Sequence, residues 1–375
     1  MKIAIMGIRG IPSSYSGFET CAEQLGKRLV ERGHQVTVYC RSHHITYPGT
    51  SYKGMRLVKL PTIANKYLDT IIHSFISSLH AMTQQYDAAL YFIVGNSPIV
   101  WIPRLVGTKT ILNVDGLDWK REKWPFLAKQ YIKCSEYLAT KVPNAYITDS
   151  RVVQGYYRDR FGDEPPYIPY GSEVDMVPPG ETLARFGLEP YRYILFVGRL
   201  VPENCAHHLI EAFLGLDTDF KCVIVGAASY AEKYIASLRT MAQGDPRIVF
   251  TGYVFGKRYY ELGSHAYIFI KTSGVGGTSP ALVEAMAFGS CVVVHNTLEN
   301  LETIGDAGFA YDGTVGAESL RKALQRLLSQ PALVKEYRRR ARQRTQRHYT
   351  WEAVTDAYER LFYELCDKPL PDADG

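Results

Sequence analysis

Along this 375-residue chain, short apolar runs alternate with segments of helical periodicity, and the alternation occurs in two successive sets. The first set of apolar runs lies at residues 3–6, 35–40, 88–94, 110–114 and 145–148, and the second at 193–197, 221–225, 248–251, 267–270 and 291–294. Strands separated by helices form right-handed βαβ units and a parallel sheet. The sequence therefore predicts an α/β protein with two doubly wound, Rossmann-like parallel sheets.

A segment rich in proline, glycine and acidic residues, 162–171, separates the two sets. Such residues cannot continue a sheet, so this segment is interpreted as a linker. The predicted divisions are an N-terminal domain at 1–165, a C-terminal domain at 166–348, and a final helical segment at 349–375 that packs across the domain junction. Ligands of open α/β sheets bind beyond the carboxyl ends of the strands. The two domains are therefore expected to face a central cleft.

The composition narrows the class of protein. A formal net charge of +5 is too small and too dispersed for a nucleic-acid binder. The seven cysteines never form a CxxC pair, and the His43-His44 and His207-His208 pairs lack metal-ligand spacing, so no disulfide, metal or other cofactor is expected. No apolar run is long enough for a signal peptide or a membrane span, which predicts a cytoplasmic protein.

A glycine-containing loop at 7–20 follows the first predicted strand and precedes a helix. Glycines there let backbone N–H groups approach an anion, although the loop lacks the G-x-G-x-x-G spacing of a dinucleotide site. It is interpreted either as a substrate loop or as an ordinary strand-to-helix turn. A second turn, at 95–98, has the same two interpretations. The residues predicted to line the acceptor side are Gly10, Ser16, Gly17, Glu19 and Asn96.

The segment 273–289 carries the most chemical information. Ser279 is a good N-cap, Pro280 suits the first helical position and Gly289 suits the residue after the helix, which predicts a helix over 280–288. Three glycines and two hydroxyl groups precede it, and bare amides at a helix N-terminus form an anion site. Glu284, one turn in, can accept hydrogen bonds from a vicinal diol, or it is a solvated carboxylate. The predicted donor-binding residues of this segment are Gly276, Gly277, Thr278, Ser279 and Glu284.

Arg199 follows the strand 193–197 and is expected at the carboxyl edge of the second sheet. A guanidinium there can bind a diphosphate through two hydrogen bonds and offset the charge that grows as the phosphate leaves. The alternative is an arginine in a structural salt bridge.

The motifs VGRLVPEN (197–204) and SGVGGTSPALVEAMAFG (273–289) resemble the retaining glycosyltransferases of GT-B family 4, which use nucleotide-sugar donors. The segments GIRGIPSSYSGFET (7–20), NVDGLDWKREKW (113–124) and YIPYGSE (167–173) are similar to a bacterial subgroup of rhamnosyltransferase-like proteins. The resemblance covers most of the chain, and it implies a GT-B architecture.

The resemblance also implies roles for single residues. Arg199 matches the arginine that binds the donor diphosphate, and Glu284 matches the second glutamate of the family's paired motif, which holds the donor ribose. Asn204 stands where the family has a lysine, and Gly276 stands where it has the glutamate that contacts the donor sugar. Asp115 corresponds to a histidine at a strand end. These departures indicate either altered sugar recognition, for which L-rhamnose is a candidate, or an inactive copy.

The proton of the acceptor hydroxyl needs a base. Asp115 or Asp118, at a predicted strand end, is a candidate catalytic carboxylate. In retaining relatives the leaving phosphate is thought to take this proton instead.

A basic, aromatic-rich stretch at 120–133 fits contact with an anionic membrane leaflet, where a lipid-linked acceptor would lie, or it is a solvated helix face.

The sequence thus predicts a retaining, metal-independent hexosyl or deoxyhexosyl transferase. It would move a sugar, with L-rhamnose from dTDP-L-rhamnose as the candidate, to a glycan or lipid-linked acceptor in bacterial cell-surface polysaccharide synthesis. Two alternatives remain: a non-catalytic subunit that binds nucleotide-sugar or glycan, and an epimerase or oxidoreductase on similar sheets.

Overall fold

The structure is a computed structural model that describes residues 1–13, 17–65, 68–121, 124–228 and 231–370. The chain forms two compact units. The N-terminal unit comprises Met1–Gly171 and Trp351–Gly375, and the C-terminal unit comprises Ser172–Thr350. The first unit therefore ends at Gly171 rather than at the expected residue 165, because the segment 162–171 remains attached to it through a bridge between Thr148 and Tyr167.

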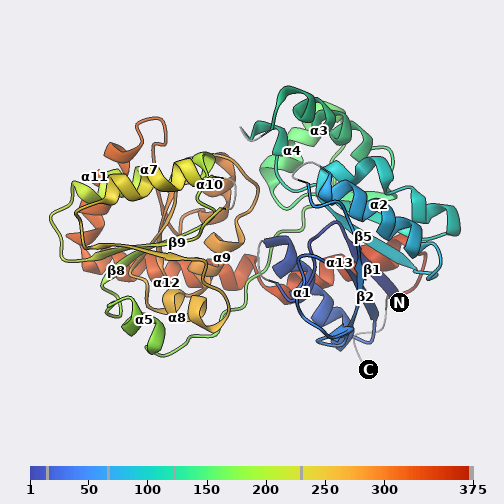
Figure 1. The fold of residues 1–375 in the computed structure, drawn as a ribbon, viewed down its shortest axis with the longest axis horizontal. Coiled ribbons are helices and arrows are strands. Elements are labelled where there is room, and N and C mark those ends of the chain that lie inside the picture. The colour runs from blue at the N-terminus through green and yellow to red at the C-terminus, as the bar shows by residue number, and fades with distance from the viewer. Residues whose placement is uncertain (14–16, 66–67, 122–123, 229–230, 371–375) are drawn as a thin grey trace. The chain divides into compact units, whose positions relative to one another are not determined.

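The N-terminal unit is built on a seven-stranded sheet of order β3-β4-β2-β1-β5-β6-β7 (Figure 1). The strands are β1 (Lys2–Met6), β2 (Gln35–Arg41), β3 (Ser51–Tyr52), β4 (Met55–Leu60), β5 (Ala88–Phe92), β6 (Lys109–Asn113) and β7 (Ala145–Ile147). Neighbouring strands are parallel except for the β3–β4 hairpin. The five predicted strands are all present, and this hairpin is an addition that the apolar pattern did not predict.

Helices and short 3₁₀ turns connect these strands. The helices are α1 (Gly17–Glu31), α2 (Asp69–Ala81), α3 (Phe126–Ala139), α4 (Arg151–Phe161) and α13 (Trp351–Leu365). The 3₁₀ turns are η1 (Val94–Ile99), η2 (Ile102–Val106) and η3 (Asp118–Lys120). The near-continuous apolar strands β1, β2 and β5 are buried on both faces of the sheet, as parallel strands covered by helices are.

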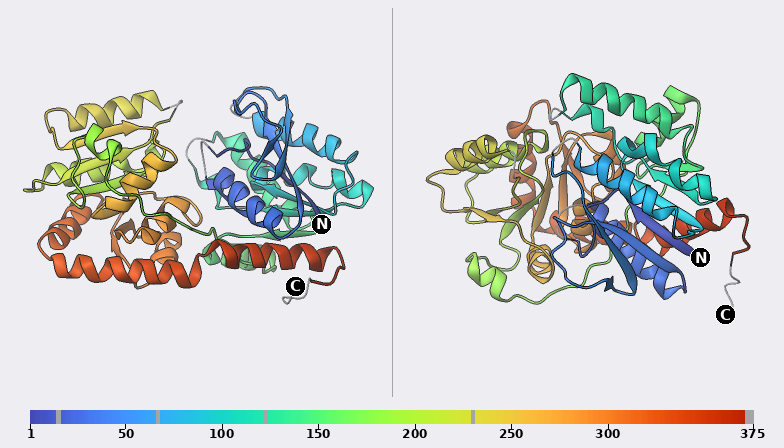
Figure 2. Two further views of the ribbon diagram at one scale, coloured as in Figure 1. Left: turned by 90° about the horizontal axis from the view of Figure 1, so that it is seen from below. Right: turned by 45° about the vertical axis from the view of Figure 1, so that its right-hand side comes forward.

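Helix α13 belongs to the N-terminal unit although it follows the C-terminal unit in sequence. Trp351, Tyr358 and Phe362 are buried in the same apolar core as strands β1 and β2. Arg28 of α1 donates a 2.8 Å hydrogen bond to Glu352 of α13, and the two helices lie side by side in the views of Figures 1 and 2. The sequence predicted a helix here, and the structure assigns it to this unit.

The C-terminal unit contains a six-stranded, wholly parallel sheet of order β10-β9-β8-β11-β12-β13. Its strands are β8 (Tyr193–Val197), β9 (Lys221–Val225), β10 (Ile248–Gly252), β11 (Ile268–Lys271), β12 (Cys291–His295) and β13 (Phe309–Tyr311). The helical segments are α5 (Glu181–Arg185), η4 (Pro202–Asn204), α6 (Ala206–Leu214), α7 (Glu232–Ala242), α8 (Lys257–His265), α9 (Pro280–Ala287), α10 (Leu298–Ile304), α11 (Ala317–Leu328) and α12 (Pro331–His348). The predicted fold class of two doubly wound parallel sheets is confirmed.

Candidate active site

Arg199 lies directly beyond the carboxyl end of β8, the strand between β9 and β11. Its side chain is half-buried. Within the part of the chain that the structure describes, the guanidinium has no hydrogen-bond acceptor and no carboxylate partner. The structural salt bridge that the sequence left open is thus not formed by these residues. Because arginine keeps its charge at any physiological pH, the carboxyl edge of this sheet carries a fixed positive group.

The side chain of Asn204 joins the loop that carries Arg199 to the loop after β11. Its Nδ2 donates a 2.8 Å hydrogen bond to the carbonyl of Arg199, and its Oδ1 accepts a 3.0 Å hydrogen bond from Ser273 Oγ. The backbone carbonyl of Asn204 also accepts a hydrogen bond from Thr272 Oγ1. Asn204 is buried. It therefore holds two loops together, a role for which the sequence carried no signal beyond the departure from lysine.

Helix α9 begins at the predicted residue, Pro280, and ends at Ala287, one residue before the predicted end. Ser279 is the extended N-cap, Pro280 opens the helix, Phe288 is the C-cap and Gly289 follows with φ +74°. The structure gives no acceptor for the backbone N–H groups of Gly276, Gly277 and Ser279 among the residues that it describes. These amides and the helix N-terminus form a positively polarised edge. Asn204 holds this loop to the one that bears Arg199.

Glu284, on the second turn of α9, is half-buried against α8. Tyr259 of α8 donates a 2.7 Å hydrogen bond to Glu284 Oε2. Burial raises the pKa of Glu284 to about 7, and the hydrogen bond from Tyr259 acts in the opposite direction. The pKa of this carboxyl group therefore lies near neutral pH, as the pKa values of acid–base and ligand-binding groups commonly do. Tyr259 is a site residue that sequence reasoning missed.

Two glycines of this region differ sharply in their surroundings. A Cβ atom built on Gly276 meets no heavy atom within 4 Å, so this position opens into space. A Cβ atom on Gly226, after β9, would lie 1.9 Å from the carbonyl oxygen of Gly198, and Gly226 has φ +143°. Gly226 is therefore required for the close approach of the β8 and β9 loops, whereas the absence of a side chain at Gly276 is not a packing requirement.

At the carboxyl end of β6 in the N-terminal unit, the candidate carboxylates Asp115 and Asp118 have different environments. Asp115 has φ +57°, which is unusual for a residue with a side chain, and its N–H donates to Asn113 Oδ1 at 3.0 Å. Asp118 accepts a hydrogen bond from Arg121 Nε and forms an ion pair with it. Of the two carboxylates, Asp115 is the one with a positive φ.

The loop residues predicted for the acceptor side have structural contacts in this structure. The carboxylate of Glu19 is buried and accepts a 2.9 Å hydrogen bond from the N–H of Arg9. Gly10 has φ +127°, and a Cβ there would lie 2.7 Å from Cys40 Sγ. Asn96 is buried and donates to the carbonyl of Phe92 at 2.7 Å. Gly17 is the first residue of α1, and Ser16 lies outside the described residues.

Helix α3 covers most of the stretch 120–133, of which residues 122 and 123 lie outside the described ranges. It exposes 72% of Phe126 and 80% of Leu127, and Tyr131 is exposed on the same helix. Exposed apolar side chains that are contiguous on a surface mark contact sites, whereas single ones are common on soluble proteins. Among the described helices, none is long and apolar enough to cross a membrane.

The structure also contains a cavity and a side-chain cluster that the sequence analysis did not predict. A cavity of about 620 Å³ is lined by residues from α5, the segment after β10 and the start of α8, among them Arg185, Tyr253, Phe255, Lys257 and Arg258. The side chains of Cys205, His207 and His208 come together at the start of α6. The sequence analysis had excluded the His207-His208 pair as metal ligands because it lacks metal-ligand spacing.

The two α/β units define the GT-B fold, and solved enzymes of sugar chemistry share it. Sucrose-phosphate synthase from Thermosynechococcus elongatus aligns with a TM-score of 0.81 at 19% identity, over 97% of this chain and 98% of that one. HepE from Anabaena in complex with UDP-glucose aligns with a TM-score of 0.78 at 15% identity, over 97% and 100%. WaaG, a glycosyltransferase involved in lipopolysaccharide biosynthesis, aligns with a TM-score of 0.73 at 16% identity, over 95% and 99%.

Sequence families give a finer assignment for each half. Residues 183–347 match the family described as glycosyl transferases group 1, which supports a sugar-transferring glycosyltransferase. Residues 1–173 match a family described as a domain of unknown function (DUF1972). No curated protein matches the sequence.

Proposed function

We propose that the protein is a retaining glycosyltransferase that takes a sugar from a nucleotide-diphosphate donor bound to its C-terminal unit. One observation carries the proposal: Asn204 holds the loop of Arg199 against the loop that leads into α9. A guanidinium and a row of backbone amides then meet one anionic group. This combination suits a diphosphate, and the nearby Glu284 suits the hydroxyls of a ribose.

In the proposed reaction, the bond between the anomeric carbon and the diphosphate oxygen breaks, and a bond from that carbon to the acceptor oxygen forms. The nucleoside diphosphate leaves with the bonding electron pair. Arg199 and the backbone amides of Gly276, Gly277 and Ser279 stabilise the negative charge that develops on the leaving diphosphate. The acceptor proton passes to the leaving phosphate or to Asp115. The acceptor alcohol would bind at the carboxyl edge of the N-terminal sheet.

For the donor sugar we propose a 6-deoxyhexose, with L-rhamnose from dTDP-L-rhamnose as the leading candidate. Gly276 offers no carboxylate for sugar hydroxyls, and a 6-deoxy sugar presents one hydroxyl fewer. The acceptor would be a glycan or a lipid-linked sugar of a bacterial cell-surface polysaccharide. The exposed apolar residues of α3, together with Lys129 and Lys133, favour a cytoplasmic enzyme that lies against an anionic membrane.

A second candidate function is a non-catalytic subunit that binds nucleotide-sugar or glycan. It is favoured by Asn204, whose side chain is already engaged by Arg199 and Ser273. No lysine ammonium is then available at this position to help neutralise the leaving diphosphate.

The deciding experiment screens nucleotide-diphosphate sugars by thermal shift and then measures transfer and donor hydrolysis with the donors that bind. Arg199→Ala is expected to leave the melting temperature nearly unchanged and to lower turnover by about 100-fold or more. Arg347→Ala, at an exposed arginine near the end of α12, is the matched control. A bound donor that is never turned over, even with acceptor extract, supports the binding subunit, and normal kinetics in Arg199→Ala rejects the assignment of the site.

A further inference from the structure

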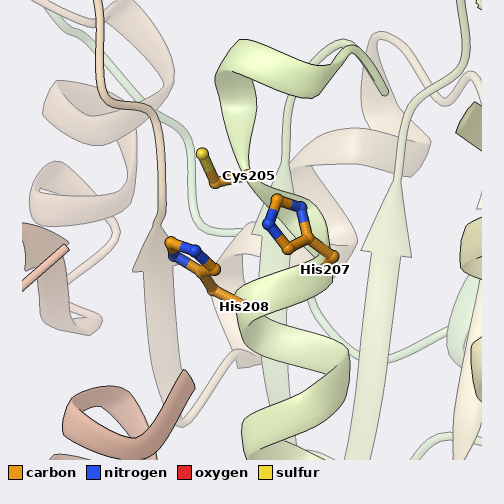
Figure 3. Close-up of side chains that lie close together, drawn as sticks. All are labelled: Cys205, His207 and His208. Carbon is orange, nitrogen blue, oxygen red and sulfur yellow. The ribbon is translucent and has the colours of Figure 1, made fainter. Parts of the chain in front are cut away.

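Three side chains with metal-binding chemistry converge where the 3₁₀ turn η4 meets helix α6. Cys205 is the residue between the two elements, and His207 and His208 lie in the first turn of α6. One potential ligand atom from each of the three lies within 4.8 Å of those of the other two. Figure 3 shows the thiol and both imidazoles gathered at this end of the helix.

Each imidazole is held by a tyrosine from a different element. His207 Nδ1 is 2.9 Å from the hydroxyl of Tyr234 in α7, and His208 Nδ1 is 3.2 Å from the hydroxyl of Tyr311 in β13. Histidines that bind a metal through one nitrogen usually donate a hydrogen bond through the other, which fixes the tautomer and the ring orientation. With Nδ1–H donated to a tyrosine oxygen, Nε2 carries the lone pair that a metal ion needs.

The backbone at Cys205 is a second, independent observation. Cys205 has φ +47° and ψ +38°, the left-handed conformation that glycine and asparagine adopt most readily. A cysteine there costs on the order of 1 kcal/mol relative to glycine, and such strain is typical of functional positions.

We propose that Cys205, His207 and His208 form a binding site for Zn²⁺. A thiolate and two imidazoles are ligands that this ion prefers, and a water molecule or another ligand would complete the tetrahedron. In a zinc site the ligand atoms lie about 3.5 Å apart, and here they already lie within 4.8 Å of one another. On binding, the thiol of Cys205 loses its proton to solvent as the Zn–S bond forms. The site does not depend on the proposed sugar transfer.

Its place in the fold gives the site a structural consequence. Cys205 directly follows Asn204, the residue that fastens the loop of Arg199 to the loop of Ser273. A metal ion bound at Cys205 would anchor the end of the turn 199–205 to α6, α7 and β13. Bound Zn²⁺ is therefore expected to raise the melting temperature, because it binds only the folded site.

The test uses the full-length protein after treatment with a chelator, titrated with Co²⁺ and then with Zn²⁺. One Co²⁺ per chain is expected, with a thiolate-to-metal charge-transfer band and the intense d–d bands of tetrahedral coordination, both abolished by Zn²⁺. Wild-type protein that gives no thiolate band, or only the weak bands of octahedral Co²⁺, overturns the proposal without recourse to any variant.

Variants then locate the ligands. Cys205→Gly suits the left-handed backbone and removes the thiol, so it is expected to fold, to lose the charge-transfer band and to lose the Zn²⁺-dependent thermal shift. His208→Gln is expected to weaken binding by about 100-fold or more, and Tyr234→Phe, which leaves the ligands in place, by about 10-fold to 100-fold.

Two controls remove rival sites. Cys134→Ser changes an exposed thiol, and the double variant His43→Asn/His44→Asn removes the imidazoles of a second cluster with Asp69 in the N-terminal unit. Both are expected to bind Co²⁺ as the wild type does. If either control loses the thiolate band, or if Cys205→Gly retains it, the site is elsewhere and the proposal is wrong.

Discussion

The hydroxyl of Tyr259 donates a 2.7 Å hydrogen bond to Oε2 of Glu284, across the contact between helices α8 and α9. Burial raises the pKa of this carboxyl group to about 7, and the tyrosine keeps it from rising further. The pair therefore sets the fraction of Glu284 that is ionised near neutral pH. Only the ionised form has both oxygens available as acceptors for the hydroxyls of a ribose.

Donor affinity is expected to increase as the pH rises through about 7, because Glu284 ionises in that range. Tyr259→Phe removes a hydrogen bond that stabilises the carboxylate, so its pKa rises and the midpoint of the binding curve moves to higher pH by about one unit. The measurement is the Kd of a nucleotide-diphosphate sugar between about pH 6 and 8.5, a range over which its diphosphate does not titrate. Glu284→Gln is expected to abolish the dependence, and Tyr260→Phe to leave the midpoint in place. A flat wild-type profile contradicts the assignment.

Replacing Asn204 with lysine is expected to lower the stability of the protein and to weaken donor binding, although the glycosyltransferases that the motif resembles carry a lysine there. The amide of Asn204 is buried between the carbonyl of Arg199 and the hydroxyl of Ser273, and a longer charged side chain cannot replace both contacts. Asn204→Lys is expected to lower stability by about 1–3 kcal/mol, measured by denaturant unfolding, and to weaken donor binding. Ser273→Ala, which deletes one of the two contacts, is the milder comparison. An Asn204→Lys variant of full stability and higher turnover would contradict the bridging role of Asn204.

Side chains are expected to be tolerated at Gly276 and not at Gly226. Gly276→Glu places its Cβ in open space, so the free energy of unfolding is expected to change by less than about 0.5 kcal/mol. The binding affinity of donors whose sugar carries more hydroxyls is expected to rise relative to that of 6-deoxy sugar donors. Gly226→Ala forces a Cβ against the carbonyl of Gly198 at a φ that alanine rarely adopts, so it is expected to destabilise the C-terminal unit. The checks are thermal melts and a donor competition assay. Equal stability of the two variants contradicts the geometry.

The exposed end of α3 offers a test of membrane contact. Leu127→Asp replaces an apolar side chain that is 80% exposed with a charge that anionic lipid repels. Flotation with vesicles that contain phosphatidylglycerol is expected to recover less of this variant than of the wild type, whereas Leu298→Asp, at an exposed leucine of α10 in the C-terminal unit, leaves recovery unchanged. If the wild type does not float, the membrane proposal is wrong.

Local patterns were sufficient to predict most of the regular elements, although strand β13 of the C-terminal sheet was not among those predicted. The apolar runs 193–197 and 221–225 coincide with β8 and β9, and the Ser279, Pro280 and Gly289 signals set the limits of α9 to within one residue. The hairpin β3–β4 was missed, because its two-residue strand and its partly exposed partner lack the continuous apolar pattern of the buried strands.

Contacts between distant segments could not be predicted. Tyr259 lies 25 positions before Glu284, and the tyrosines that orient His207 and His208 come from α7 and β13. The cavity beside α8 is likewise assembled from α5 and the segment after β10. The dismissal of His207-His208 as a ligand pair rested on spacing alone, and it left out the turn that brings Cys205 to the same end of α6.

The assignment of α13 to the N-terminal unit has a consequence for biosynthesis. Trp351, Tyr358 and Phe362 complete a core whose other residues come mainly from the first third of the chain. During synthesis, the apolar core of the N-terminal unit therefore cannot be completed until α13 has been translated. The C-terminal unit, Ser172–Thr350, is continuous in sequence and can fold before that core is complete. This order is the reverse of the usual one, in which the N-terminal domain folds first during synthesis.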